Sequence, residues 1–273
     1  MVRTLFTVFN IPVPSYIFFN FLAFISFYIV LSHQARRDPS ISRRILLIYF
    51  LVLFSATIGS RLFYGLFHPS IFKGNLLNIF SNNVRGFSMA GGLLLVLFIV
   101  IIYCRITRIS LRKLLDMMAP AFGLGLFFSR LACFFNGCCF GKPFPFNWKI
   151  LVYPEFSPPW WTHETHGQAL HPTQLYEALG GLAIFMITIL AERKPKPDGF
   201  LFIILCWIYG PVRFITDFFR YNPDPDPPPL QLSQYFSIFI FIFGFILLGY
   251  LYSERKKKAA EGDRLTGSSY NLD

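Results

Sequence analysis

Four polar side chains recur along one apolar segment, "YGPVRFITDFFR" at residues 209–220. They lie at intervals of four, four and three residues, and they are Tyr209, Arg213, Asp217 and Arg220. This spacing places them on one face of a helix, where the carboxylate of Asp217 can pair with both guanidinium groups. Arginine presents a planar fork of donors that suits a phosphate group. The stripe predicts either an anion-binding face or an internal ion pair that only locks the helix.

Two further arginines, Arg61 and Arg130, also lie inside apolar stretches. A charge at such a depth is expensive and usually faces a cavity. At about 1.5 Å per residue, Arg61 and Arg130 are expected roughly 24 Å from the cytoplasmic ends of their helices and Arg213 roughly 21 Å. These arginines share one level toward the outer leaflet, which predicts a pocket for a phospholipid head group. Interfacial snorkelling remains the alternative, above all for Arg61.

A second polar segment, "HPTQLYEAL", opens another apolar stretch. Pro172 in a first helical turn needs no amide partner, so His171 is expected just outside the helix, at the membrane surface. Gln174 and Glu177 continue inward one turn apart. A histidine at this place is either a capping and hydrogen-bonding residue or a proton acceptor with an ordinary pKa of about 6.5.

The elements that carry these residues are membrane helices. Of the 273 residues, 54% are hydrophobic, 14% are charged and 35 are phenylalanine, which is typical of a membrane protein. Seven apolar stretches are long enough to cross a hydrocarbon core of roughly 30 Å. They are 13–32, 45–66, 89–104, 115–135, 173–191, 199–219 and 234–252. We expect an all-α polytopic protein with seven transmembrane helices, the first retained because it lacks a small-residue cleavage site.

The basic residues set the expected orientation. Sixteen of the 25 lysines and arginines fall on alternate connections, at 36–44, 105–113, 193–196 and 255–264. The positive-inside rule makes these connections cytoplasmic, so the N-terminus lies outside and the C-terminus inside. One membrane domain is expected at 1–252, followed by a basic and then polar cytoplasmic tail at 253–273. Most of the net charge of +11 lies in these cytoplasmic loops and in the tail, where it faces anionic membrane lipid. No nucleic-acid partner is therefore expected.

The five cysteines show no spacing typical of zinc sites. They are Cys104, Cys133, Cys138, Cys139 and Cys206. "NGCCFG" gives neighbours rather than a C-x-x-C pair, so no metal is expected there. Cys104 and Cys206 are expected to be buried and inert. For Cys133, Cys138 and Cys139, close to an oxidising outer face, a disulfide is the alternative.

The outer loop 143–170 is rich in proline and tryptophan. Its segments "FPFNWK" and "SPPWW" are typical either of a simple interfacial anchor or of a surface that binds a protein partner. "THETH" in the same loop places His163 and His166 around Glu164, but it offers no helix and no third ligand. No metal is expected there either.

Four segments together carry a family resemblance. "IGSRLFYGLF" (58–67), "SRLACFFNGCCFG" (129–141), "HPTQLYE" (171–177) and "YGPVRFITDFFR" (209–220) resemble the bacterial prolipoprotein diacylglyceryl transferases. The resemblance implies a multi-pass enzyme of the bacterial cytoplasmic membrane with seven helices. It would move a diacylglyceryl group from phosphatidylglycerol to the lipobox cysteine thiol of a secreted prolipoprotein, recognised by its signal peptide, and release glycerol phosphate. No cofactor is implied.

The spacing and the resemblance together give a set of predicted site residues. We predict that Arg130, Tyr209, Arg213 and His171 are catalytic. The predicted substrate-binding residues are Tyr16, Arg61, Gly91, Gly92, Asn136, Gly141, Gln174, Tyr176, Glu177, Asp217 and Arg220. Within the family signature Gly-Arg-x-Gly-Asn-Phe-x-Asn-x-Glu, Arg130 matches the arginine and Asn136 the second asparagine, and Gly141 matches the closing glycine.

The departures from the signature are concentrated in one segment. Ser129 and Ala132 stand for its two glycines, and they stay small enough for close helix packing. Cys133 stands for the first asparagine and Cys138 for the glutamate, which changes the chemistry. The thiol of the implied reaction belongs to the substrate, so the cysteines of this chain are not expected to be the nucleophile.

A further departure removes a candidate base. Family members read Ser-Phe-His-Gly-Gly where this chain has residues 88–92, so Ala90 replaces their histidine. A thiol with a pKa of about 8.5 is already partly ionised at neutral pH, so this loss is expected to lower the rate without abolishing the reaction. His171 is then the best remaining proton acceptor. A diverged transferase with another acceptor, and a non-catalytic lipid-binding or lipid-moving protein, remain alternatives.

Overall fold

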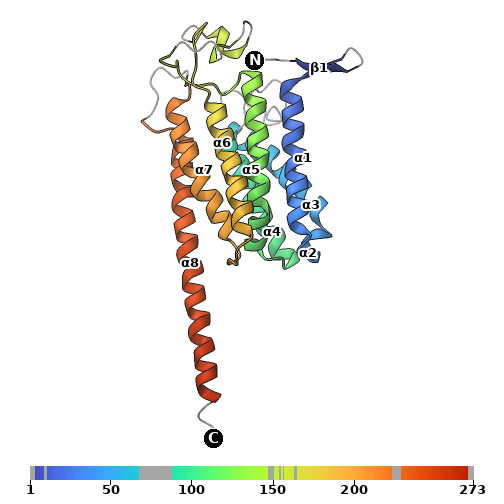
Figure 1. The fold of residues 1–273 in the computed structure, drawn as a ribbon, viewed down its shortest axis with the longest axis vertical. Coiled ribbons are helices and arrows are strands. Elements are labelled where there is room, and N and C mark those ends of the chain that lie inside the picture. The colour runs from blue at the N-terminus through green and yellow to red at the C-terminus, as the bar shows by residue number, and fades with distance from the viewer. Residues whose placement is uncertain are drawn as a thin grey trace.

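The computed structural model describes residues 4–8, 11–67, 88–146, 151–153, 155, 157–162, 165–222 and 229–269. Seven long helices form one bundle (Figure 1). They are α1 (Ser15–Ala35), α3 (Ile45–Phe67), α4 (Met89–Thr107), α5 (Leu111–Asn136), α6 (Thr173–Glu192), α7 (Phe200–Phe219) and α8 (Leu232–Ser269). All seven are long and apolar enough to cross a membrane, which confirms the seven predicted spans.

Four short elements were not predicted. Strands β1 (Thr4–Val8) and β2 (Ile11–Pro14) pair antiparallel before α1, at the upper end of the bundle in Figure 1. A single turn, α2 (Pro39–Ser42), joins α1 to α3, and the 3₁₀ helix η4 (Pro158–Trp161) lies in the long upper loop. Such elements are too short to show hydrophobic periodicity, so the sequence carries no signal for them beyond turn residues.

Helix α8 extends well beyond the expected apolar span. It continues through Ser253 to Ser269 and protrudes from the lower end of the bundle (Figure 1). The residues after 252 are rich in Ala, Glu, Lys and Arg, which are strong helix formers, so the helix continues where hydrophobicity ends. No break in secondary structure marks residue 253, and the division into a membrane domain and a tail stays a prediction.

Small residues let neighbouring helices approach closely at the centre of the bundle. A Cβ added at Gly123 on α5 would lie 2.6 Å from the backbone nitrogen of Phe185 on α6. A Cβ added at Gly181 on α6 would lie 2.8 Å from the carbonyl oxygen of Gly123. Helices in a membrane associate by such van der Waals packing rather than by a hydrophobic driving force. The contact sets the distance between the polar residues that α5 and α6 carry further up.

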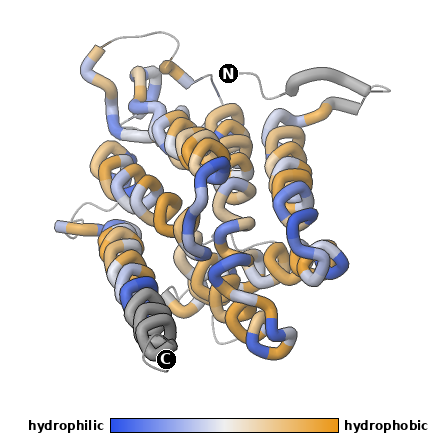
Figure 2. Tube along the Cα trace, turned by 60° about the horizontal axis from the view of Figure 1, so that its bottom comes forward, coloured by the Kyte–Doolittle hydropathy of each residue, from blue (hydrophilic) through white to orange (hydrophobic). Residues whose placement is uncertain are grey.

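The lower end of the bundle holds the basic connections. Figure 2, in which this end is turned toward the viewer, shows hydrophilic turns here and mainly hydrophobic helices behind them. The carboxylate of Asp116 on α5 accepts hydrogen bonds from the backbone N–H groups of Gly199 and Phe202, at 2.8 and 2.9 Å. Asp116 therefore caps the first turn of α7 from a neighbouring helix, and it fixes where α7 begins.

Candidate functional site

Glu177 lies at the centre of a buried cluster of charges near the upper end of the bundle. Its two carboxylate oxygens lie 2.7 Å from Arg130 Nη2 on α5 and 2.6 Å from Arg213 Nη1 on α7. Arg220, at the end of α7, places Nη1 3.8 Å from the same carboxylate. Glu177 is 2% exposed and Arg130 9%. The expected common level of Arg130 and Arg213 is confirmed, because one side chain contacts both.

Asp217 completes this cluster from within α7. Its Oδ1 lies 3.0 Å from Arg213 Nη2 and 4.0 Å from Arg220 Nη1, as the predicted helical stripe requires. Ser233 on α8 donates a hydrogen bond from its hydroxyl to Oδ2. Three guanidinium groups thus share two carboxylates, which leaves an excess of positive charge in a buried place. Such an excess favours an anion.

Met89 is a site residue that the sequence analysis did not identify. Tyr209 donates a hydrogen bond from its hydroxyl to Met89 Sδ at 3.2 Å, and Arg130 Nη2 lies 3.4 Å from the same sulfur. A thioether is a weak acceptor, so an anionic oxygen would be a stronger partner for both donors. The only available signal was the position of Met89 in the first turn of α4, beside Ala90.

Arg130 has one more donor available. Its Nε atom is buried, and among the residues that the structure describes it has no hydrogen-bond acceptor. A buried donor without an acceptor is unfavourable by about 1–3 kcal/mol. The guanidinium of Arg130 can therefore gain a partner when an anion binds.

A short backbone ladder fixes the ends of three helices beside the cluster. The N–H of Gly141 donates to His171 O at 3.0 Å, and the N–H of Lys142 donates to Phe219 O at 2.8 Å. A Cβ added at Gly141 would lie 2.5 Å from His171 Cβ and 2.6 Å from Phe219 O. Gly141 therefore holds the segment after α5 against the start of α6 and the end of α7. Its local role is to place His171 and Arg220.

His171 lies just before α6, as predicted, in an aromatic environment. Its Nδ1 is 3.1 Å from the hydroxyl of Tyr176, and its ring packs against Phe144 and Phe219 with centroid distances of 4.8 and 4.9 Å. Burial lowers the pKa of His171 below its ordinary value. The cause is desolvation of the ring, which disfavours its charged form.

Gln174 contacts the turn after α5 rather than the guanidinium groups. Its Nε2 donates to the carbonyl of Cys138 and to the hydroxyl of Tyr153, both at 2.8 Å. The hydroxyl of Thr173 donates to the carbonyl of Cys139 at 2.7 Å. These bonds tie the turn at residues 137–140 to the first turn of α6.

Gly91 and Gly92 lie on the face of α4 that packs against α3. A Cβ added at Gly91 would lie 2.0 Å from Phe63 Cβ, and one added at Gly92 would lie 3.0 Å from Ala56 O. Their geometry is that of close helix packing. Arg61 lies on α3. This helix packs mainly against α4, with a few contacts to α1, and it is not one of the helices that carry the charge cluster. Its contact with substrate stays a prediction.

The remaining predicted residues lie at the upper surface. Tyr16, in the first turn of α1, is 43% exposed, and Asn136 at the end of α5 is exposed. Of the "THETH" segment, His163 and Glu164 lie outside the described residues. His166 contacts the carbonyl of Trp160 through Nδ1 at 2.9 Å.

Two of the five cysteines are buried, as predicted. Cys104 and Cys206 are buried, at 3% and 2% exposure. Cys133, Cys138 and Cys139 are only partly buried, and all five are free thiols in the structure rather than disulfide-bonded. The three partly buried cysteines lie together beside the turn that Gln174 holds.

A cavity of about 490 Å³ extends between the helices below the charge cluster. Helices α1, α3, α4, α5, α7 and α8 line it, mainly with phenylalanine, leucine and valine. Met89, Ser129 and Tyr209 lie among the lining residues, so the apolar space adjoins the donors around Met89. An apolar cavity next to a positively charged polar cluster suits an amphiphile with an anionic head group.

Comparison with known proteins agrees with this geometry. Residues 3–250 match the family model described as prolipoprotein diacylglyceryl transferase. The chain is 34% identical over 194 residues to the phosphatidylglycerol–prolipoprotein diacylglyceryl transferase of Idiomarina loihiensis. The aligned region covers 70% of this chain and 69% of the relative. The relative of the same name from Geobacter sulfurreducens is 32% identical over 207 residues, 74% and 75% of the two chains. The relative of the same name from Oleidesulfovibrio alaskensis is 37% identical over 174 residues, which are 63% of this chain and 61% of the relative.

Proposed function

The chain belongs to the prolipoprotein diacylglyceryl transferase family, and from that premise we propose that it transfers a diacylglyceryl group from phosphatidylglycerol to the cysteine thiol of a prolipoprotein, in the bacterial cytoplasmic membrane. One observation carries the proposal beyond the family match. Arg130, which is buried, and Arg213 and Arg220, which are partly buried, share two carboxylates, and an apolar cavity adjoins this cluster at Met89 and Tyr209. The acyl chains of the donor would lie in the cavity and its phosphate would lie at the cluster.

The cluster would act on the leaving group. In the reaction, the acceptor thiolate attacks the glyceryl carbon that carries the phosphate. A carbon–sulfur bond forms while the carbon–oxygen bond breaks, and the electron pair leaves on the oxygen of glycerol phosphate. Arg130 and Arg213 would stabilise the negative charge that grows on the phosphate, and they are held in place by Glu177 before the reaction begins.

Tyr209 would contribute a hydrogen bond to the same oxygen atoms. Its hydroxyl now donates to Met89 Sδ, and a small movement of this thioether would expose the donor to the phosphate. Asp217 would set the orientation of Arg213 from the next turn of α7. Arg220, whose guanidinium lies 3.8 Å from Glu177, would add a longer-range contribution to the positive potential.

His171 is the candidate side chain to accept the proton of the acceptor thiol. His171 is neutral at pH 7 because burial lowers its pKa, so its ring can accept a proton. In the tautomer whose Nδ1–H donates to the hydroxyl of Tyr176, Nε2 is unprotonated and would be the acceptor atom. The alternative is that the positive potential of the arginines alone raises the thiolate fraction of the acceptor.

The acceptor would approach from the upper loops. Trp161 and Phe146 expose 69% and 62% of their surfaces there, and aromatic side chains favour a membrane interface. An extended lipobox segment that follows an apolar signal peptide would enter at this level. We expect the loop at 143–170 to contact that segment.

A transfer assay tests this function directly. The full chain is reconstituted in vesicles with phosphatidylglycerol labelled in its acyl chains and with a lipobox peptide. The expected products are a thioether-linked diacylglyceryl group on the peptide cysteine and an equal amount of glycerol phosphate. A peptide with serine in place of that cysteine is the control.

The same assay separates the alternative of a non-catalytic lipid-binding protein. The position of Ala90, where the resemblance expects a histidine, is the observation that favours this alternative. Saturable binding of phosphatidylglycerol without any product would support lipid binding and contradict the transferase. Absence of both binding and product would contradict the donor pocket itself.

A further inference from the structure

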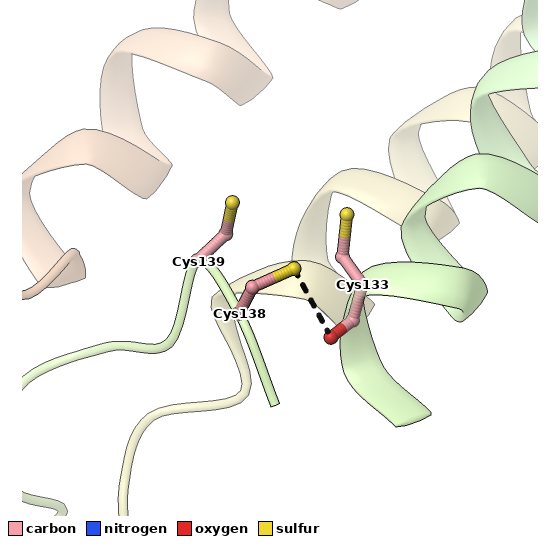
Figure 3. A group of neighbouring side chains, drawn as sticks. All are labelled: Cys133, Cys138 and Cys139. Carbon is pink, nitrogen blue, oxygen red and sulfur yellow. Dashed lines mark hydrogen bonds between the residues drawn. The ribbon is translucent and has the colours of Figure 1, made fainter. Parts of the chain in front are cut away.

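Three thiols converge at the upper end of α5. Cys133 lies on the last turn of this helix, and Cys138 and Cys139 follow in the turn beyond it. All three sulfur atoms lie within 4.8 Å of one another. Figure 3 shows the thiols of Cys133 and Cys139 pointing in the same direction, with the thiol of Cys138 directed toward Cys133.

The backbone produces this convergence. Gly137 ends α5 with a φ of 74°, and Cys139 has a φ of 61°. Adjacent residues in an extended chain point to opposite faces, whereas the left-handed conformation of Cys139 turns its side chain back toward the other two. Residues with a Cβ rarely adopt this conformation, because the Cβ approaches the carbonyl oxygen. The linear spacing of "NGCCFG" gave no indication of it.

Hydrogen bonds from other segments fix the turn. The N–H of Cys138 donates to Cys133 O at 3.1 Å. Gln174 holds the carbonyl of Cys138, and Thr173 holds the carbonyl of Cys139. The backbone of the turn is therefore held by α5 and by two side chains of α6. The three sulfur positions are fixed in this way, and a ligand would meet a preformed site.

The spacing suits a bound cation better than a disulfide. A metal–sulfur bond of about 2.3 Å places the sulfurs of a three-thiolate site about 4 Å apart, within the observed limit. A disulfide needs about 2.05 Å and would leave one of the three thiols unused. The adjacent pair also has its Cα atoms only about 3.8 Å apart across a trans peptide, closer than a disulfide normally allows.

We propose that Cys133, Cys138 and Cys139 form a three-thiolate site for a thiophilic cation, Zn²⁺ or Cu⁺. Binding would release the three thiol protons to solvent. Three thiolates with Zn²⁺ carry one net negative charge, and with Cu⁺ they carry two. Arg130 and Arg220 act electrostatically on Cys139, so this negative charge would lie beside the positively charged cluster.

Metal titration of the full chain tests the site. The protein is purified in detergent, reduced and kept free of oxygen, and then titrated separately with Zn²⁺ and with Cu⁺ against a chromophoric competitor. We expect one cation per chain. Cys133→Ser, Cys138→Ser and Cys139→Ser are each expected to weaken binding by roughly tenfold or more. Cys104→Ser and Cys206→Ser are matched controls outside the cluster, and they should bind as the wild type does.

A second measurement keeps the test valid if a cluster variant misfolds. In the wild type, the bound cation should protect the thiols of Cys133, Cys138 and Cys139 from alkylation, read residue by residue by mass spectrometry. Failure of the reduced wild type to bind either cation would overturn the site, including the case in which two cluster cysteines are recovered as a disulfide. Undiminished binding to a folded triple variant would overturn it equally.

Discussion

The two ends of the bundle pair basic and acidic side chains in different ways. At the lower end Arg112 pairs with Glu254 and Lys113 with Asp38, one cation to one carboxylate, and the basic side chains are 37% and 38% exposed. At the upper end three guanidinium groups share Glu177 and Asp217, with side-chain exposures of Arg130 and Arg213 of 11%. Solvent screens the lower pairs, whereas the upper cluster keeps its excess positive charge in a buried place. The lower pairs join connections, and the upper cluster is ready for an anion.

The largest expected difference between the two ends comes from removing one carboxylate at each. Glu177→Gln leaves buried guanidinium groups without their shared partner, and we expect a loss of stability of about 3–5 kcal/mol together with loss of transfer. Glu254→Gln at the exposed lower pair should change stability by about 0–1 kcal/mol. Unfolding in detergent measures both. Equal effects of the two substitutions would remove the distinction between the ends.

The second prediction concerns the proton acceptor of the upper end. Burial lowers the pKa of His171, so the ring is neutral above that pKa and gains a proton as the pH falls through it. If His171 accepts the thiol proton, transfer should decline on the acidic side of the wild-type profile. His171→Gln should slow transfer by about 100-fold and abolish that decline. Full activity of this variant down to pH 6 would assign activation of the thiol to the arginines alone.

The third prediction tests the backbone ladder beside the cluster. Gly141→Ala brings a Cβ to 2.5 Å from His171 Cβ and against two backbone carbonyl oxygens, so the segment must move. We expect a loss of about 1–3 kcal/mol in stability and reduced transfer, because Arg220 and His171 move with it. Gly249→Ala on α8, where an added Cβ has no atom within 4 Å, is the matched control and should be neutral or slightly stabilising. A neutral Gly141→Ala variant would contradict the role of the ladder.

The smallest expected effect lies at the lower end. Hydrogen bonds from Lys113 and Ser40 hold the pKa of Asp38 below its ordinary value. A depressed folded-state pKa contributes stability above the unfolded pKa of about 3.9, and this contribution is lost as the pH falls below it. Because the side chain of its partner Lys113 is 38% exposed and solvent screens the pair, Asp38→Asn should lower stability at pH 7 by at most about 1 kcal/mol. A larger loss would show that this end is not screened as described.

The sequence was informative where a physical pattern extends over many residues. Apolar runs of about 20 residues predicted all seven spans, and the intervals of four and three predicted the stripe from Tyr209 to Arg220. The same reasoning could not place Glu177 at the centre of the arginines, because that contact depends on how closely α5, α6 and α7 pack. Met89 was missed because a thioether carries no signal of polar function.

The cysteine cluster shows a different limit of sequence reasoning. Its three thiols are brought together by one left-handed residue, Cys139, and by contacts from α6. Linear spacing rules assume a regular element or a known turn, and neither describes residues 137–140. The hairpin of β1 and β2 was missed for a related reason, because strands of five and four residues beside a long helix show no clear alternation.

The central claim is that the guanidinium forks of Arg130 and Arg213 hold the donor phosphate. Its most direct test is the rate of diacylglyceryl transfer from phosphatidylglycerol by Arg130→Lys and Arg213→Lys, which keep the charge and lose the planar fork. Arg112→Lys at the lower end is the matched control. We predict that each upper variant loses transfer by about 100-fold or more while the lower variant keeps it. Rates close to the wild type in both upper variants would contradict the claim.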